Sequence, residues 1–186
     1  MGRPKALLPD GGGRVFVTRI LHTLREAGVA RIAVVTGSLH ESIVAAVAAD
    51  APLRAAITFV RNPDPSRGQL SSLLAGLNVM DAPGVDAVLI TLVDVPFVAA
   101  STVRGVVEAW RRSGAPIVRP ACRARHGHPV LFARSIFGEL RGADPELGAK
   151  AVLRAHASLV LDVETEDEGA LVDVDTQQEY ERALLL

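Results

Sequence analysis

Residues 86–96 read DAVLITLVDVP. The first part of this stretch, residues 86–92, is almost entirely apolar, which predicts a strand buried near the centre of a sheet. Asp94 follows the strand directly, and Pro96 stiffens the turn behind it. Because ligands of open α/β sheets bind beyond the carboxyl ends of the strands, we expect Asp94 to face a ligand. The alternative is an ordinary Asp-x-Pro turn that binds nothing.

Short β-branched runs alternate with helical patterns along the rest of the chain. The predicted strands are residues 31–36, 57–60, 86–92, 116–119, 129–133 and 159–163. The predicted helices are residues 13–27, a segment capped by Ser38 with Glu41 in its first turn, 71–80, 102–112, 135–140, 148–156 and 177–184. This alternation predicts a single α/β domain over residues 1–186, with helices packed around a mainly parallel sheet.

The composition disfavours several classes of protein. The chain has 186 residues, of which 49% are hydrophobic, enough for one well-filled core. Its net charge is −1 and no basic stripe is present, which gives no support to nucleic-acid binding. The single cysteine, Cys122, fits a reducing compartment. Since no apolar run is long enough for a bilayer and no signal peptide is recognisable, we expect a soluble, cytoplasmic protein without membrane partners.

Two segments carry residues suited to a nucleotide. Near the N-terminus, Gly2 allows close backbone approach and Lys5 is a compact cation for phosphate oxygens, although a solvated lysine on a loose terminus is the alternative. Residues 62–73 form a polar loop that leads into a predicted helix. Amides and hydroxyls at a helix start bind anions or the edge of a base. Alternatively, Ser71 or Ser72 simply caps the helix.

Two further segments carry histidine and aspartate. Cys122, His126 and His128 suggest a metal site, but the H-x-H spacing lacks a matching second half. A turn at His128 that presents a polar group to an acceptor substrate is the favoured interpretation. The second segment, residues 171–176, reads LVDVDT before the last predicted helix. One of its aspartates can face the site, or the segment serves only to cap the helix.

In this order, the segments resemble the molybdenum-cofactor nucleotidyltransferases, the MobA/MocA-like group, over nearly the whole chain. The matching residues are Gly2, Pro4 and Lys5; Asn62, Gly68, Ser72 and Leu73; Asp94 and Pro96; Gly127, His128, Pro129 and Val130; and Asp173 to Thr176 with Glu179 and Tyr180. No single motif is specific, but five in register are. The match to the family's N-terminal signature begins at Met1. The family's first strand, its glycine-rich loop and an arginine would precede that point.

The resemblance implies a three-layer Rossmann-like nucleotidyltransferase fold with a mainly parallel mixed sheet. It also implies transfer of CMP from CTP to the phosphate of molybdopterin, with Mg²⁺ and release of pyrophosphate. Lys5 would hold the triphosphate, Asp94 would bind Mg²⁺, and Asp173 or Asp175 would complete the metal shell. The implied nucleotide-binding residues are Gly2, Lys5, Asn62, Gly68, Ser71 and Ser72, and the implied acceptor-binding residues are His128 and Pro129. The Ser71-Ser72-Leu73 sequence is similar to the cytidylyltransferase branch, and GTP is the alternative donor.

Other functions fit the same residues. A nucleotidyltransferase of this fold could use another phosphorylated acceptor, such as a sugar phosphate or phospholactate. A non-catalytic protein could instead carry the molybdenum cofactor to a molybdoenzyme. In the family, the missing first strand lies between strands that correspond here to residues 32–36 and 87–92. A stable fold therefore requires a closed gap, a strand from a neighbouring molecule, or further residues.

Overall fold

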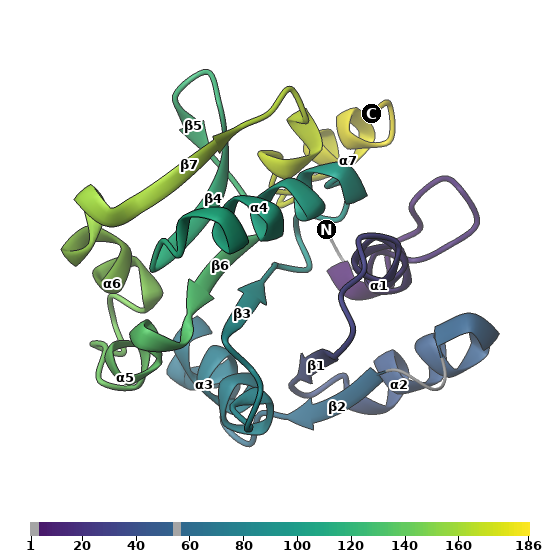
Figure 1. Ribbon diagram of the computed structural model, residues 1–186. Helices are drawn as coiled ribbons and strands as arrows, with labels where there is room; N and C mark the ends of the chain where they lie inside the picture. Colours follow the sequence, from purple (N-terminus) through teal and green to yellow (C-terminus); the bar gives the residue numbers. More distant parts are fainter. Residues whose placement is uncertain (1–3, 54–56) are drawn as a thin grey trace.

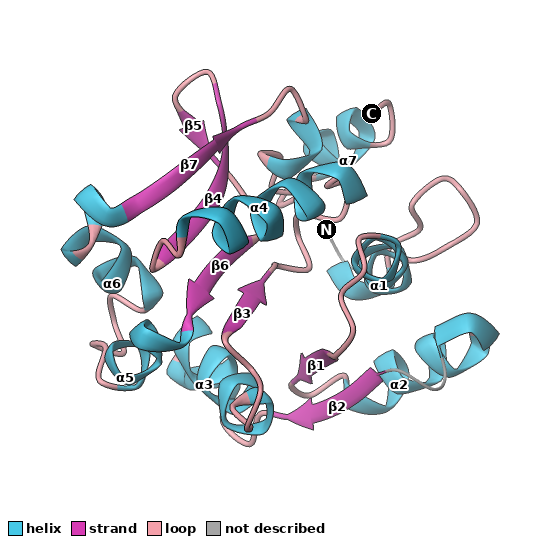
Figure 2. Cartoon of the chain, viewed as in Figure 1, coloured by secondary structure: helices cyan, strands magenta, loops and turns pink. Residues whose placement is uncertain are grey.

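The computed structural model describes residues 4–53 and 57–186 and shows an α/β fold (Figures 1 and 2). The helices are α1 (Phe16–Glu26), α2 (His40–Ala49), α3 (Gln69–Met80), α4 (Ala100–Ser113), α5 (Phe137–Arg141), α6 (Ala149–Ala155) and α7 (Gln177–Ala183). The strands are β1 (Ile32–Thr36), β2 (Ile57–Arg61), β3 (Ala87–Ile90), β4 (Ile117–Cys122), β5 (Arg125–His126), β6 (Val130–Ala133) and β7 (Val160–Glu164). Short 3₁₀ turns include η1 (Lys5–Leu7) and η6 (Glu168–Ala170).

The strands form one parallel pair and one larger mixed sheet, which confirms the mixed sheet that the resemblance implied. β1 and β2 pair in parallel, as do β4 and β7. β6 runs antiparallel to both β3 and β4, and β5 runs antiparallel to β4. The larger sheet has fewer parallel pairs than predicted. In one of its antiparallel pairs, β4 and β5 are joined by a turn at Arg123 and Ala124, both of which have positive φ. A connection this short can only reverse the chain.

Helices cover both faces of the larger sheet, which confirms the predicted three layers. Side chains of neighbouring strand residues point to opposite faces. Val118 and Leu131 pack with Val106 of α4 in one apolar cluster. Ile117 and Phe132, their neighbours in sequence, pack in another cluster with α3, α5 and α6. In Figure 1, α4 crosses one face of this sheet, where it contacts β4, β6 and β7.

β3 lies at the end of the larger sheet, not at its centre. Among the described residues it pairs only with β6, and β1 pairs only with β2. All four residues of β3 are therefore half-buried rather than buried, despite their apolar character. Val34 of β1 and Leu89 of β3 nevertheless pack in the same apolar cluster. The strand that the family resemblance places between β1 and β3 stays a prediction.

Two helix starts differ from the predicted ones. Ser38 does not cap α2, which begins at His40 with Leu39 as its N-cap. Ser38 therefore stands one residue too early for its hydroxyl to meet the first free amides of the helix. α1 begins at Phe16 instead of Gly13 because the preceding residues form a loop. Asp10 holds this loop by accepting hydrogen bonds from the amides of Gly12 and Arg14.

A helix that crosses a bilayer needs about 20 consecutive, predominantly apolar residues. Within residues 4–53 and 57–186, none of the helices meets that requirement.

Candidate active site

Lys5 lies among carboxylates that come from distant parts of the chain. Its Nζ forms an ion pair with Asp175 and lies 3.6 Å from Oδ2 of Asp94. Lys5 belongs to η1, Asp94 follows β3, and Asp175 precedes α7. The amide of Val174 donates a hydrogen bond of 2.8 Å to the carbonyl of Asp94, which holds the two acidic loops together. Lys5, Asp94 and Asp175, all selected from the sequence, thus meet at one place.

Asp94 has one carboxylate oxygen without a partner. Its Oδ1 is buried and accepts no hydrogen bond from any described residue. A buried oxygen in this state costs free energy unless something else satisfies it. A hard cation prefers such carboxylate oxygens, so the donor set fits a divalent metal.

The carboxylates do not, however, form a ready-made metal cage. Within the described ranges, no group of three or more His, Cys, Asp or Glu side chains is arranged to hold a metal ion. Asp94 and Asp175 are close enough to Asp173 for their negative charges to shift its pKa. Lys5, however, is paired with Asp94 and Asp175. His126 is engaged elsewhere, since its Nε2 lies 3.2 Å from Oδ2 of Asp162.

The charges of this cluster shift several pKa values. Burial raises the pKa of Asp173, and the negative charges of Asp94 and Asp175 raise it further. Burial alone would lower the pKa of Lys5, but its hydrogen bond to Asp175 and the charge of Asp94 outweigh that effect and raise it. The site therefore carries more negative charge than Lys5 can neutralise, as expected of a site that binds further cations.

His128 faces the same cluster from the loop before β6. Its Nδ1 lies 3.5 Å from the carbonyl oxygen of Ile90, a long hydrogen bond when Nδ1 carries the proton. Burial lowers the pKa of His128, although Asp173 and Asp94 act in the opposite direction. The backbone amide of His128 donates to the carbonyl of Ala170 in η6. A side chain at Gly127 would overlap that same carbonyl, which explains the glycine in this motif.

A second group of predicted residues surrounds the start of α3. The amide Nδ2 of Asn62 donates to the hydroxyls of Ser71, at 2.8 Å, and Ser72, at 2.9 Å. Its Oδ1 accepts from the amide of Asp64 at 3.0 Å. Asn62 is buried and all its side-chain polar groups are engaged, so its place in the structure is to organise the loop. Direct contact with a nucleotide stays a prediction.

Ser71 and Ser72 do not cap α3, contrary to the alternative drawn from the sequence. The helix begins two residues earlier, at Gln69, with Gly68 as its N-cap. Gly68 has a φ of 84°, a conformation that favours glycine. Beside this loop lies a surface cavity of about 260 Å³ lined by Asn62, Arg67, Ser71 and Leu74, among others. Gly2, the remaining predicted nucleotide-binding residue, lies outside the described residues.

Comparison with known families decides the classification. Residues 1–160 match the MobA-like NTP transferase domain. The chain belongs to this family. The MobA-like domain resembles the crystal structure of Rv0371c from Mycobacterium tuberculosis H37Rv with a TM-score of 0.79 and 28% identity, covering 100% of this chain and 91% of that one. A second structure of Rv0371c is a complex with manganese; it matches with a TM-score of 0.75 and 26% identity over 100% and 94% of the two chains.

Curated relatives cover the MobA-like domain less completely. The purine catabolism protein PucB of Bacillus subtilis is 27% identical over 121 residues, 63% of this chain and 57% of its own length. A probable molybdenum cofactor guanylyltransferase of Rhodopirellula baltica is 30% identical over 123 residues, 63% of this chain and 53% of its own length. The chain thus spans little more than half the length of these relatives.

Tyr180 is a residue of the MobA-like domain whose contacts the sequence did not reveal. Its hydroxyl donates a hydrogen bond of 2.8 Å to the carbonyl of Pro9, and its ring packs against Phe16. Tyr180 therefore attaches α7 to the segment that follows Lys5. Thr176 lies in the segment that the sequence suggested as a cap, and it caps the same helix. It also forms a capping box with Glu179. Only the resemblance pointed to Tyr180, because a single tyrosine in a terminal helix carries no pattern of its own.

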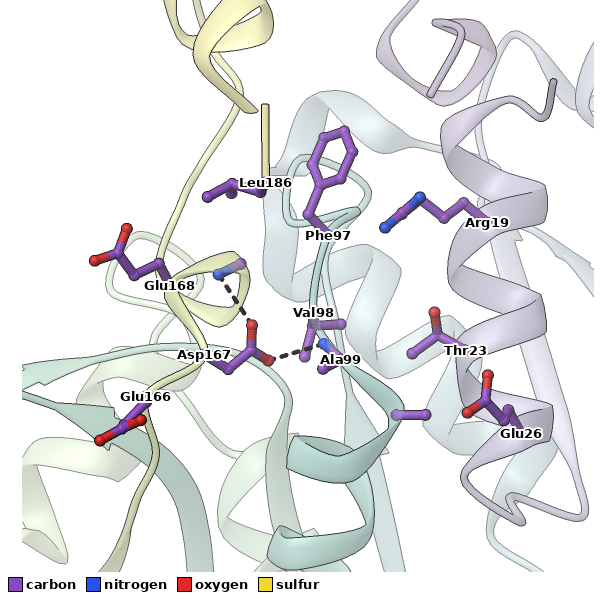
Figure 3. Close-up of a pocket in the computed structure, with 12 residues that line it drawn as sticks. Arg19, Thr23, Glu26, Phe97, Val98, Ala99, Glu166, Asp167, Glu168 and Leu186 are labelled. Atoms are coloured by element: carbon purple, nitrogen blue, oxygen red, sulfur yellow. Dashed lines mark hydrogen bonds between the residues drawn. The ribbon is translucent and has the colours of Figure 1, made fainter. Parts of the chain in front are cut away.

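A larger cavity of the MobA-like domain lies beside the segment that follows Asp94. Its volume is about 510 Å³, and it lies between α1, the start of α4 and η6 (Figure 3). The carboxylate of Asp167 lies against the start of α4, where it accepts hydrogen bonds from the amide of Ala99 and the hydroxyl of Thr102. Arg19 donates to the carbonyl of Pro96 from the opposite wall. None of these residues was selected from the sequence.

Proposed function

We propose that this MobA-like domain transfers a nucleotidyl group from an NTP to the phosphate of a molybdopterin-type acceptor. An acceptor phosphate oxygen forms a bond to the α-phosphorus, the bond between that phosphorus and the bridging oxygen breaks, and pyrophosphate leaves. The observation that carries this proposal is the contact of Lys5 with Asp94 at the end of β3, together with the buried, unpartnered Oδ1 of Asp94 among the described residues.

The residues have separate parts in the proposed reaction. Lys5 binds triphosphate oxygens, and Asp94 holds a divalent cation with help from Asp173 or Asp175. Such a cation would neutralise charge on the phosphates and fix their position. His128 and Pro129, next to this cluster, are the proposed contacts of the acceptor. No protein nucleophile is needed, because positioning and charge neutralisation supply most of the rate in phosphoryl transfer.

The identity of the metal is proposed as Mg²⁺. The manganese complex of Rv0371c supports a divalent cation, since the two proteins share the fold over 100% of this chain and 94% of that one at 26% identity. The buried carboxylate oxygen of Asp94 is the ligand type that both Mg²⁺ and Mn²⁺ accept.

CTP is the proposed donor, because Ser71, Ser72 and Leu73 resemble the cytidylyltransferase branch. GTP is the second candidate, and the relative from Rhodopirellula baltica, named as a probable molybdenum cofactor guanylyltransferase, favours it. Both donors would place their base near the loop that Asn62 organises. Delivery of the product to a molybdoenzyme stays a prediction.

The test is an assay of pyrophosphate release with Mg²⁺ and each donor, with molybdopterin as acceptor. The proposal predicts release that requires both molybdopterin and CTP. Sugar phosphates and phospholactate are run in parallel, and release with one of them alone would reassign the acceptor. Nucleotide binding without release from any acceptor would instead support a non-catalytic carrier.

A further inference from the structure

Lys5 is paired with the same carboxylates that the proposed function assigns to the metal. It contacts Asp175 and lies 3.6 Å from Oδ2 of Asp94, while Oδ1 of Asp94 has no partner among the described residues. The proposed partner of Lys5 during the reaction is the triphosphate. Lys5 cannot neutralise the carboxylates and the triphosphate fully at the same time.

We propose that Lys5 is an exchangeable counter-ion, which leaves Asp94 and Asp175 for the triphosphate and thereby opens them to the divalent cation. Metal and nucleotide then bind cooperatively, and the metal alone binds weakly. This inference rests on the proposed function, because it takes the metal and triphosphate sites from there.

Electrostatics supports competition between Lys5 and a metal. An ammonium within about 4 Å of a divalent cation repels it strongly, because both lie in a partly buried site where water screens poorly. Side chains of Lys5 and Asp94 are only 31% and 26% exposed. A divalent cation at Asp94 must therefore either displace Lys5 or bind beside an uncompensated positive charge.

The local structure allows Lys5 to move without unfolding the segment that carries it. Its backbone carbonyl accepts a hydrogen bond of 3.0 Å from the amide of Leu8, which closes the η1 turn. Tyr180, in α7, donates a hydrogen bond to the carbonyl of Pro9. The backbone is thus anchored, whereas the four-carbon stem of lysine turns freely. Its partner Asp175 is 62% exposed, so that pair breaks at little cost.

The first test is a titration of the full chain with Mn²⁺ alone, in which electron paramagnetic resonance measures the concentration of the free ion. Lys5→Met keeps the length of the side chain and removes its charge. We expect this variant to bind Mn²⁺ more tightly than the wild type by about fivefold or more, the lower end of typical coupling between two sites. Lys150→Met, in α6, makes the same change outside the cluster and is expected to bind Mn²⁺ as the wild type does.

The second test needs no substitution. Lys5 and Lys150 are the only lysines of the chain, so reductive ¹³C-methylation labels two side chains and the N-terminal amine. The Lys5 signal is expected to move when CTP is added together with Mg²⁺ and that of Lys150 to stay in place. A Lys5 signal that stays in place when CTP is bound would overturn the exchange.

The two proposals fail in different ways. Equal or weaker Mn²⁺ binding by Lys5→Met overturns the counter-ion role, whether or not nucleotides bind. Failure of the wild type to bind any nucleotide overturns the proposed function instead, and the Mn²⁺ titration still reports on Lys5.

Discussion

Asp94 is the residue on which the proposed chemistry depends most, because it lies in the loop after β3, faces Lys5 and keeps a buried oxygen without a partner among the described residues. Asp94→Asn preserves the shape of the side chain and removes its charge. We predict that pyrophosphate release falls by about 100-fold or more, the usual loss when an aligned electrostatic group is removed. The melting temperature is expected to change little. Asp162→Asn serves as the matched control, because Asp162 is an aspartate of β7 that pairs with Arg119 of β4, outside the cluster. Full activity of Asp94→Asn would exclude Asp94 from the mechanism.

Asn62 is expected to act on stability more than on chemistry. Asn62→Ala leaves the amide of Asp64 and the hydroxyls of Ser71 and Ser72 without their buried partner. We predict a loss of about 1–3 kcal/mol in the free energy of unfolding, the usual cost of leaving buried polar groups unsatisfied. Urea denaturation measures it. Asn78→Ala, at an exposed position of α3, should stay within about 0.5 kcal/mol of the wild type.

His128 makes stability depend on pH. Burial lowers its pKa in the folded state below the ordinary value of 6.5. Its contribution is therefore fully present above pH 6.5 and is lost as the pH falls through the folded-state pKa. His128→Gln cannot take up this proton, so its stability relative to the wild type should improve between neutral and acidic pH. Urea denaturation across that range checks the sign, and a parallel decline in both proteins would contradict it.

At the scale of single residues, the sequence identified individual side chains of the site but not their contacts. Resemblance brought Lys5, Asp94 and Asp175 together, and the structure places them in contact. The sequence could not show that neighbouring groups occupy all the hydrogen-bonding positions of the Asn62 side chain, because those contacts depend on how the loop before α3 folds. The ion pairing of Lys5 was equally hidden, since its partner Asp175 is 170 residues away.

At the scale of elements, α7 fixes the position of the segment that carries Lys5. Tyr180→Phe removes the hydrogen bond to Pro9 and keeps the ring against Phe16. We predict a loss of about 0.5–1.5 kcal/mol in the free energy of unfolding, typical of one hydrogen bond. The KM for the nucleotide should rise more than kcat falls, because Lys5 is held less firmly. Steady-state kinetics with the donor that proves active separates the two, and an unchanged KM would argue against this positioning role.

Most elements could be predicted from apolar periodicity, but their starts and directions could not. Ser38 lies one residue too early to cap α2, and Gly68 lets α3 begin before Ser71 and Ser72, for which capping was the alternative interpretation. The reversal after β4 depends on a turn at Arg123 and Ala124, which contains neither glycine nor asparagine. That turn decides the antiparallel pairing of β4 and β5. The resemblance implied a mixed sheet, but the apolar patterns could not show which of its strands run antiparallel.

At the scale of the whole molecule, two groups of strands share one apolar cluster through Val34 and Leu89 but are not paired with each other among the described residues. The family match over residues 1–160 and the likeness to Rv0371c agree with the fold that the resemblance implied. The donor and acceptor depend on a few side chains around one site, which the fold does not determine.

The most direct test of the central claim is a calorimetric titration of the 186-residue chain with CTP and with GTP, each in the presence and absence of Mg²⁺. The proposed site predicts binding that requires Mg²⁺, is tighter for CTP than for GTP, and is lost in Asp94→Asn. Absence of binding by both nucleotides, or binding that neither Mg²⁺ nor Asp94→Asn affects, would contradict it.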